Sequence, residues 1–230
     1  MSTPKTMGII NATPDSFYDG GANNTVKEAT KLAEKHMING ATFIDVGGYS
    51  SRPGAKNISE ESEIDRVIPI IKAINKNFPE AIISIDTFRA EVAKVALNEG
   101  ACIINDISAF NLDTNLFSII KEFNVPYVLM HMQGEPSTMQ DDPNYKNIIQ
   151  ELISFFSKKI QHLNQNGIHD VILDPGFGFG KKLNDNFMLL QKLNELRILE
   201  KPILAGISRK SMIYKYLETN LKVKITYNII

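Results

Sequence analysis

Polar residues that can bind a ligand or take part in catalysis lie near the ends of seven short apolar runs in this sequence. They are Asn11, Asp45, Asp86, Asn105, Asp106, His131, Asp174, Ser208, Arg209 and Lys210. Carboxylates and carboxamides pair with the N–H groups and carbonyls of a planar heterocycle. The cations suit an anion such as a phosphate group. These residue types therefore indicate a site for a polar heterocycle with an anion beside it, although each residue alone could also be a helix cap or a solvated loop residue.

The stretch from Asp174 to Lys181 is the most distinctive of these ends, because it joins an acid to three alternating glycines. Glycines let the backbone approach a ligand closely, and Pro175 stiffens the turn. The alternative interpretation is a tight strand-to-helix turn with a solvated aspartate. The glycines form neither a Walker loop, because Lys181 is not followed by Ser or Thr, nor a G-x-G-x-x-G turn. The sequence also shows no transition-metal spacing and no Ser-His-Asp order with a nucleophile elbow.

The apolar runs themselves are continuous and rich in Ile and Val, which is typical of parallel strands buried on both faces. Their ranges are Met7–Ala12, Thr42–Val46, Ile82–Ile85, Cys102–Ile104, Tyr127–Met130, Val171–Leu173 and Ile203–Ile207. Helical patterns separate them, so the repeated units predict an α/β domain. Because no glycine-rich fingerprint follows the first run, a TIM-type (β/α)8 barrel is favoured over a doubly wound sheet. Barrel enzymes place their active sites at the carboxyl ends of the strands, where the polar residues lie.

Several helix ends can be predicted from local motifs. Thr25 and Glu28 form a candidate capping box at the start of one helix. Ser59 precedes acidic residues, an arrangement that favours a helix start through capping and the helix dipole. Gly40 and Gly167 are expected to end two helices, since glycine readily adopts the left-handed conformation at that position.

The bulk composition describes an ordinary globular chain of 230 residues, with 43% hydrophobic and 22% charged residues. A formal net charge of -1 gives no broad basic surface for nucleic acid. No apolar run approaches the roughly 20 residues needed to span a bilayer. The single cysteine, Cys102, rules out an internal disulfide and fits a reducing compartment. We therefore predict a cytoplasmic protein without a nucleic-acid or membrane partner.

The end of the chain does not fit the barrel. An eighth strand and helix are needed for closure, but only residues 218–230 follow Leu217. Residues 221–227 alternate weakly between apolar and polar types, and no helical pattern follows them. Either this tail supplies a makeshift last strand, or the barrel is cut short. We accordingly expect a barrel over residues 1–217 and an atypical tail over 218–230.

Longer motifs add a resemblance to a known family. They are MGIINATPDSFYDGG at 7–21, GATFIDVGGYSSRPG at 40–54, IDT at 85–87, NDI at 105–107, LMHMQGEPSTMQ at 129–140, LDPGFGFGK at 173–181 and GISRKSMI at 206–213. In this order, from Met7 to about Leu217, they closely resemble the dihydropteroate synthases. The resemblance implies a barrel enzyme of folate synthesis that is a sulfonamide target. It would join 6-hydroxymethyl-7,8-dihydropterin diphosphate to p-aminobenzoate, release pyrophosphate, use Mg²⁺ and form a homodimer.

The resemblance also implies roles for residues that would hold the pterin. Asp174 would accept hydrogen bonds from the 2-amino group and ring N–H, and Asn105 would contact the same edge of the ring. Lys210 would face the carbonyl and N5 side, while Phe179 would border the pocket. Asp86 would face the far ring and balance charge on a methylene cation that forms after the diphosphate leaves. Asp86 and Lys210 are therefore the residues expected to be catalytic.

Four further residues are implied to serve the diphosphate and the p-aminobenzoate. Asn11 would ligate Mg²⁺ through oxygen, the ligand that a hard cation prefers. Ser51 and Arg52 would contact the diphosphate or the p-aminobenzoate. Ser208 would lie near the p-aminobenzoate carboxylate.

Two features depart from the family pattern. Tyr49 and Ser51 stand where the family usually has an acidic or small residue and Thr. Residues 211–230 contain no Arg or His, although the family carries an Arg-x-His motif on its last strand. Two alternative interpretations follow, a truncated pterin-binding relic without catalysis and a pterin-dependent methyltransferase that shares the barrel. The p-aminobenzoate-loop motifs argue against the methyltransferase.

Overall fold

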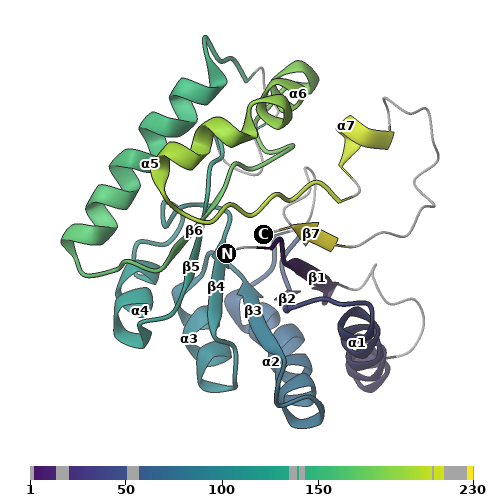
Figure 1. Cartoon of the computed structure of the whole chain (residues 1–230). Coiled ribbons are helices and arrows are strands. Elements are labelled where there is room, and N and C mark those ends of the chain that lie inside the picture. The colour runs from purple at the N-terminus through teal and green to yellow at the C-terminus, as the bar shows by residue number, and fades with distance from the viewer. Residues whose placement is uncertain are drawn as a thin grey trace.

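Six parallel strands form the centre of the protein, and helices lie outside them (Figure 1). The structure is a computed structural model that describes residues 3–13, 21–50, 57–134, 139, 143–208, 210–214 and 227–229. The strands are β1 (Thr6–Asn11), β2 (Phe43–Gly47), β3 (Ile82–Asp86), β4 (Ile103–Asp106), β5 (Tyr127–Met130), β6 (Val171–Asp174) and β7 (Tyr227–Ile229). The helices are α1 (Gly21–Ile38), α2 (Glu60–Asn77), α3 (Ala90–Asn98), α4 (Leu116–Phe123), α5 (Ile148–Gln165), α6 (Leu183–Gln191), the 3₁₀ helix η2 (Leu193–Leu199) and α7 (Ser211–Tyr214).

The strand order confirms the predicted class of fold. Strands β1 to β6 lie in sequential order and pair in parallel, each followed by a helix, which is the arrangement of a TIM-type (β/α) barrel. The six predicted runs that correspond to them agree with the observed strands to within one or two residues at each end. They are predictable because both faces of each strand are covered.

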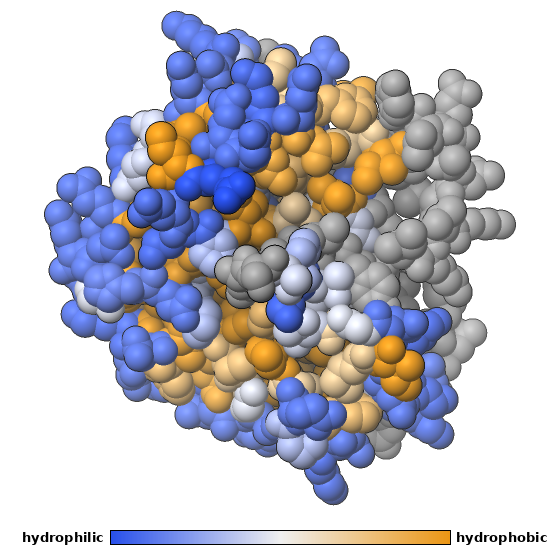
Figure 2. All heavy atoms as spheres, in the orientation of Figure 1, coloured by the Kyte–Doolittle hydropathy of each residue, from blue (hydrophilic) through white to orange (hydrophobic). Residues whose placement is uncertain are grey.

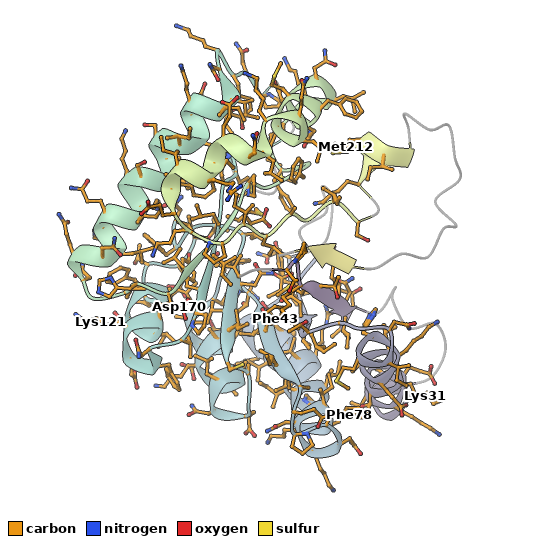
Figure 3. All side chains as sticks on the ribbon, in the orientation of Figure 1. Lys31, Phe43, Phe78, Lys121, Asp170 and Met212 are labelled. Carbon is orange, nitrogen blue, oxygen red and sulfur yellow. The ribbon has the colours of Figure 1, made fainter. Side chains whose placement is uncertain are left out.

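The two faces of the strands pack into separate cores. One buried layer takes one residue from each of five strands and one from the segment after η2: Met7, Phe43, Ile103, Val128, Ile172 and Leu204. Because residues from the first strand and from the end of the fold share this layer, it is the filling of the barrel interior. Phe43 accordingly lies near the middle of the molecule, whereas Lys31 and Lys121 lie at its periphery (Figure 3).

The second and larger core lies between the strands and the surrounding helices. It includes the alternate strand residues, such as Ile44, Ile83, Ile104 and Leu129. On the face shown in Figure 2, hydrophilic residues gather over the outer helices and hydrophobic residues show between them. Among the helices of the described ranges, none combines the length and the apolar character needed to cross a membrane.

Three of the predicted helix ends are confirmed, one by a contact and two by backbone angles, and one prediction is wrong. The Ser59 hydroxyl accepts a hydrogen bond from the Ser62 N–H at 3.1 Å and caps α2. Gly40 and Gly167 follow α1 and α5 with φ of +89° and +83°, as expected. The capping box at Thr25 does not exist, because α1 already begins at Gly21 and Thr25 lies inside the helix.

The predicted strand at Ile203–Ile207 is not a regular strand. Ile203 forms one isolated parallel bridge with Leu173. The Leu173 N–H donates to Pro202 O at 2.8 Å, and the Leu204 N–H donates to Leu173 O at 2.8 Å. The segment therefore lies along the edge of β6, but its pairing with that strand is limited to this one bridge.

The tail does contribute a strand, in the opposite direction to a barrel strand. In β7, Ile229 pairs with Thr6, Asn228 with Met7, and Tyr227 with Gly8, so the strand runs antiparallel to β1. Residues 215–226 lie outside the described residues, and the domain boundary at 217 stays a prediction.

Candidate active site

The inward-facing residues at the carboxyl ends of the strands form one row. Side chains alternate between the two faces of a strand, so residues two positions apart share a face. Asn11, Gly47, Asp86 and Asn105 are successive register partners across β1 to β4. Since Met7, Phe43 and Ile103 fill the barrel interior, Asn11, Asp45 and Asn105 face the same interior. On β6, Asp174 lies two residues after Ile172 and also faces inward.

This alternation separates two adjacent residues that the sequence could not rank. Asn105 faces the interior, whereas Asp106 faces the outer core. The Asp106 carboxylate accepts hydrogen bonds from the N–H groups of Ser108 at 2.7 Å and Phe110 at 2.6 Å, and from the Tyr127 hydroxyl at 2.7 Å. Asp106 therefore holds the loop that follows β4, and only Asn105 of the pair is available to a ligand.

Three acids, the buried Asp45 and the half-buried Asp86 and Asp174, converge at the end of the barrel. The Asn105 side-chain N–H donates to Asp45 Oδ2 at 3.0 Å. Burial, together with the charge of Asp174, raises the pKa of Asp45 to about 6. Burial also raises the pKa of Asp86 well above its usual range, and the Asp45 carboxylate adds to the rise. Mutual repulsion of this kind is a frequent property of catalytic acids.

Asp174 differs from the other two acids because cations lie near it. Burial raises its pKa, but the Gly176 N–H, which donates to Asp174 Oδ1 at 2.7 Å, and the charges of Lys210 and Lys181 oppose that rise. Asp174 is therefore the acid of the three best stabilised as a carboxylate. A carboxylate with open lone pairs can accept a bidentate pair of N–H groups.

Lys210 and Phe179 lie near Asp174 at the same end of the barrel. The Lys210 ammonium lies 4.2 Å from the centre of the Phe179 ring, within the range of a cation–π contact. Burial lowers the pKa of Lys210, while Asp174 and Asp86 favour its charged form. A Cβ on Gly178 would lie 3.3 Å from Lys210 Cδ, and Gly178 has a φ of +79°. Glycine at 178 therefore leaves room for the lysine that faces both acids.

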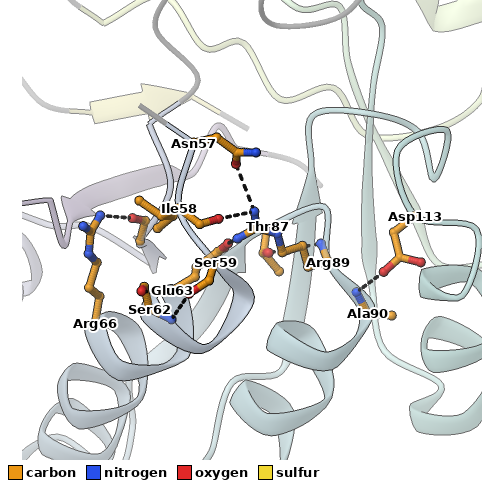
Figure 4. A network of polar contacts seen from close by, with 11 residues as sticks. Asn57, Ile58, Ser59, Ser62, Glu63, Arg66, Thr87, Arg89, Ala90 and Asp113 are labelled. Atoms are coloured by element: carbon orange, nitrogen blue, oxygen red, sulfur yellow. Dashed lines mark hydrogen bonds and ion pairs between the residues drawn. The ribbon is translucent and has the colours of Figure 1, made fainter. Parts of the chain in front are cut away.

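Sequence reasoning missed a polar network beside the row (Figure 4). The Arg89 guanidinium, just after β3, forms an ion pair with the fully buried Glu63 at 2.6 Å. It also donates to Ile58 O at 2.7 Å and lies 5.4 Å and 5.1 Å from the ring centres of Tyr49 and Phe88. Arg89, which follows β3, thereby contacts both ends of the connection between β2 and α2, at Tyr49 and at Ile58. The only sequence signal was an acid, Glu63, within an apolar helix face.

The remaining predicted site residues have the following places. Asn11 is exposed at the end of β1, and Ser208 is half-buried close to Lys210. Ser51, Arg52 and Arg209 lie outside the described residues. Within the described ranges, no group of three or more His, Cys, Asp or Glu residues could hold a metal ion.

The barrel and its inner row of acids, amide and lysine define a class of (β/α)-barrel enzymes that bind a polar heterocycle. A family model described as "Pterin binding enzyme" matches residues 7–228. The chain is 46% identical to the dihydropteroate synthase of Escherichia coli (strain K12) over 215 residues, which cover 93% of this chain and 76% of that protein. The chain therefore belongs to the pterin-binding enzyme family, and within it to the dihydropteroate synthases.

Solved structures agree with this assignment. A Yersinia pestis dihydropteroate synthase in complex with a sulfonamide drug matches with a TM-score of 0.87 and 41% identity, over 94% of this chain and 78% of that one. A Xanthomonas albilineans dihydropteroate synthase with 4-aminobenzoic acid matches with a TM-score of 0.85 and 39% identity, over 93% of this chain and 76% of that one.

Proposed function

We propose that the chain condenses 6-hydroxymethyl-7,8-dihydropterin diphosphate with p-aminobenzoate, giving 7,8-dihydropteroate and pyrophosphate. The observation that carries the proposal is the inner row, which places Asp86, Asn105 and Asp174 together with Lys210 at the end of a barrel of this family. The complexes of the relatives with 4-aminobenzoic acid and a sulfonamide drug support the same substrate class and the same sensitivity.

The pterin would be held by complementary hydrogen bonds. Asp174 would accept from the 2-amino group and the adjacent ring N–H, since its carboxylate is stabilised by Lys181 and Lys210. Asn105, fixed by its bond to Asp45, would contact the same edge of the ring. Lys210 would donate to the carbonyl and N5 side, and Phe179 would border the ring.

The chemical step breaks the C–O bond to the diphosphate and forms a C–N bond to the arylamine, which loses a proton. Positive charge that develops on the pterin methylene would be stabilised by Asp86. Burial and the charges of neighbouring acids raise the pKa of Asp86. A cation that develops beside Asp86 would lower this pKa again, because the cation and the Asp86 carboxylate stabilise each other. Catalysis would be electrostatic and positional, without a covalent enzyme intermediate.

The diphosphate would need a cation, and Asn11 has the chemistry to hold one. Its exposed amide oxygen lies at the carboxyl end of β1, and Mg²⁺ is often bound by one or two protein oxygens together with substrate phosphates and water. A bound Mg²⁺ would neutralise charge on the leaving diphosphate. Ser51 and Arg52 would contact the diphosphate or the p-aminobenzoate, and Ser208 the p-aminobenzoate carboxylate.

Two further properties belong to the same proposal. The resemblance to the family supports a homodimer, which light scattering of the purified chain would test. The single cysteine supports a cytoplasmic location, because it suits a reducing compartment. Fractionation of the cells that produce the protein would test the location.

The decisive assay is pyrophosphate release from the purified chain with and without p-aminobenzoate. We expect release that depends on p-aminobenzoate and on Mg²⁺. The second candidate function is pterin binding without catalysis, favoured by the lack of any Arg or His in residues 211–230. Calorimetric binding of the pterin substrate without turnover would support that candidate and contradict the catalytic proposal.

Asp86→Asn tests the role of the inner acid. We expect kcat to fall by roughly two orders of magnitude, because a preorganised charge that stabilises the transition state is lost. The affinity for the pterin should change much less. An equal loss of turnover and of pterin affinity would show that Asp86 only binds substrate.

A further inference from the structure

The glycine turn between β6 and α6 is held by side chains that have no proposed contact with substrate. The Lys181 ammonium donates to Gly176 O at 2.9 Å, to Phe179 O at 3.0 Å and to His131 O at 3.2 Å. It also lies 3.1 Å from His131 Nδ1. Because burial and the charge of Lys181 lower the pKa of His131 to about 3, the imidazole is neutral and this nitrogen can accept. The ammonium has three N–H groups for these four acceptors, so two of the acceptors share one N–H.

A second side chain, Asn186, also forms hydrogen bonds with the backbone of the turn. Asn186, from α6, accepts from the Gly178 N–H at 2.7 Å. Its own amide donates to Lys181 O at 3.2 Å and to Lys182 O at 2.8 Å. The Tyr145 hydroxyl adds a bond to Gly180 O at 2.6 Å. Side chains thus bond backbone groups of Gly176, Gly178, Phe179, Gly180 and Lys181, and paired backbone groups are what a buried irregular segment requires.

The burial of Lys181 indicates that its hydrogen bonds to the turn have a specific function. Only 3% of Lys181 and 4% of Asn186 is exposed to solvent. Moving an ammonium out of water is costly, and burial lowers the pKa of Lys181 to about 7. An apolar side chain of similar length would fill the same space without this cost. Among the described residues, the donors of this lysine are received by the backbone of the turn and by His131.

The geometry connects these donors to two residues of the proposed pterin site. Gly176, Gly178 and Gly180 have φ between +56° and +79°, which glycine adopts freely among other conformations, so these three residues do not by themselves fix the turn. Asp174 precedes the turn and Phe179 lies within it. Since Lys181 bonds both Gly176 O and Phe179 O, it fixes the Phe179 backbone relative to the residues that follow Asp174.

We propose that Lys181 and Asn186 are positioning residues that hold Asp174 and Phe179 in the geometry that binds the pterin ring before the ligand arrives. This inference rests on the proposed function, because it concerns the same site. Both residues act through the backbone of the turn. Prearrangement of this kind raises affinity, since a ligand then need not order the turn itself.

Calorimetric titration of the pterin substrate into the purified chain is the test, because it needs no turnover. We expect Lys181→Met to weaken pterin binding by about tenfold or more, as misplacement by a fraction of an ångström can do. Tyr145→Phe removes one hydroxyl bond to the same turn and should weaken binding by about two- to threefold. Lys159→Met is the matched control, because its half-buried ammonium bonds Ala109 O at 2.9 Å and Asn111 Oδ1 at 2.8 Å in another loop.

The outcomes separate positioning from general stability. Thermal unfolding measured on each variant should show that Lys159→Met loses stability but keeps its pterin affinity. If Lys181→Met, while folded, binds pterin as the unchanged chain does, or if both lysine variants lose the same affinity, the proposal is wrong. If Lys181→Met does not fold, Tyr145→Phe decides, and an unchanged affinity overturns the proposal.

The proposed function can fail separately. An unchanged chain that binds pterin without turnover contradicts the proposed reaction and leaves the positioning test intact. An unchanged chain that binds no pterin contradicts both.

Discussion

Replacing Asp45 by Asn should stabilise the folded protein at neutral pH. Asp45 is buried, and its pKa lies at about 6 in the folded chain against 3.8 when unperturbed, chiefly because of burial. The difference corresponds to about 3 kcal/mol, at about 1.4 kcal/mol per pH unit. The new amide side chain would keep an oxygen able to accept from Asn105 but would carry no charge.

The sign of the effect follows from proton binding. Between pH 3.8 and about 6 the folded state retains a proton on Asp45 that the unfolded state has released, so the free energy of unfolding falls as pH rises through this window. Above pH 6 the loss is complete. Asp45→Asn should therefore be nearly neutral at pH 4 and should gain about 3 kcal/mol at pH 8, which raises the melting temperature by roughly 6–12 °C for a chain of this length.

Thermal unfolding at pH 4, 6 and 8 would measure this effect, with the exposed Asp65→Asn as the matched control. The control should show little change at any of the three pH values. A gain from Asp45→Asn that is equal at pH 4 and pH 8 would mean that the buried charge is not its source. A loss of stability at pH 8 would refute the reasoning entirely.

Three other perturbations have defined outcomes. Arg89→Met leaves the fully buried Glu63 without its ion-pair partner and should cost about 3–5 kcal/mol in urea unfolding, whereas a loss below about 1 kcal/mol would mean that water reaches the acid. Ser59→Ala removes the cap of α2 and should cost about 1 kcal/mol by the same measurement, with Ser59→Asp restoring the loss. Asp174→Asn should weaken pterin binding by roughly 30- to 150-fold in calorimetry, since a charge-assisted pair of hydrogen bonds is lost; an unchanged affinity would remove Asp174 from the pterin site.

The strands were predictable because their burial is continuous in the sequence. A strand covered on both faces has few polar residues to obscure its limits, and β1 to β6 all have this property. The Ile203–Ile207 run is equally apolar, but it pairs with β6 through a single bridge, so apolar character alone does not predict a regular ladder. The alternation over residues 221–227 gave no information on direction, so the antiparallel pairing of β7 with β1 could not be foreseen.

The site was predictable in its position but only partly in its components. The ends of the runs indicated the correct face, and the register then placed Asp86 and Asn105 side by side. The sequence could not assign Asn105 inward and Asp106 outward without knowing which residues fill the interior. It also gave no sign that Lys181 is buried, because its partner His131 lies 50 residues away along the chain.

The inner acids have opposing effects on stability and function. Burial and the charges of neighbouring acids raise the pKa of both Asp45 and Asp86, so the row has a high electrostatic energy. A cationic group at the centre of the row would relieve this repulsion, and it would do so most when its positive charge is fully developed. A transition state with cationic character would therefore gain more than a neutral substrate, which is the differential that catalysis requires. Asp45→Asn should accordingly lower kcat while it raises stability, even though Asp45 has no proposed contact with the substrate.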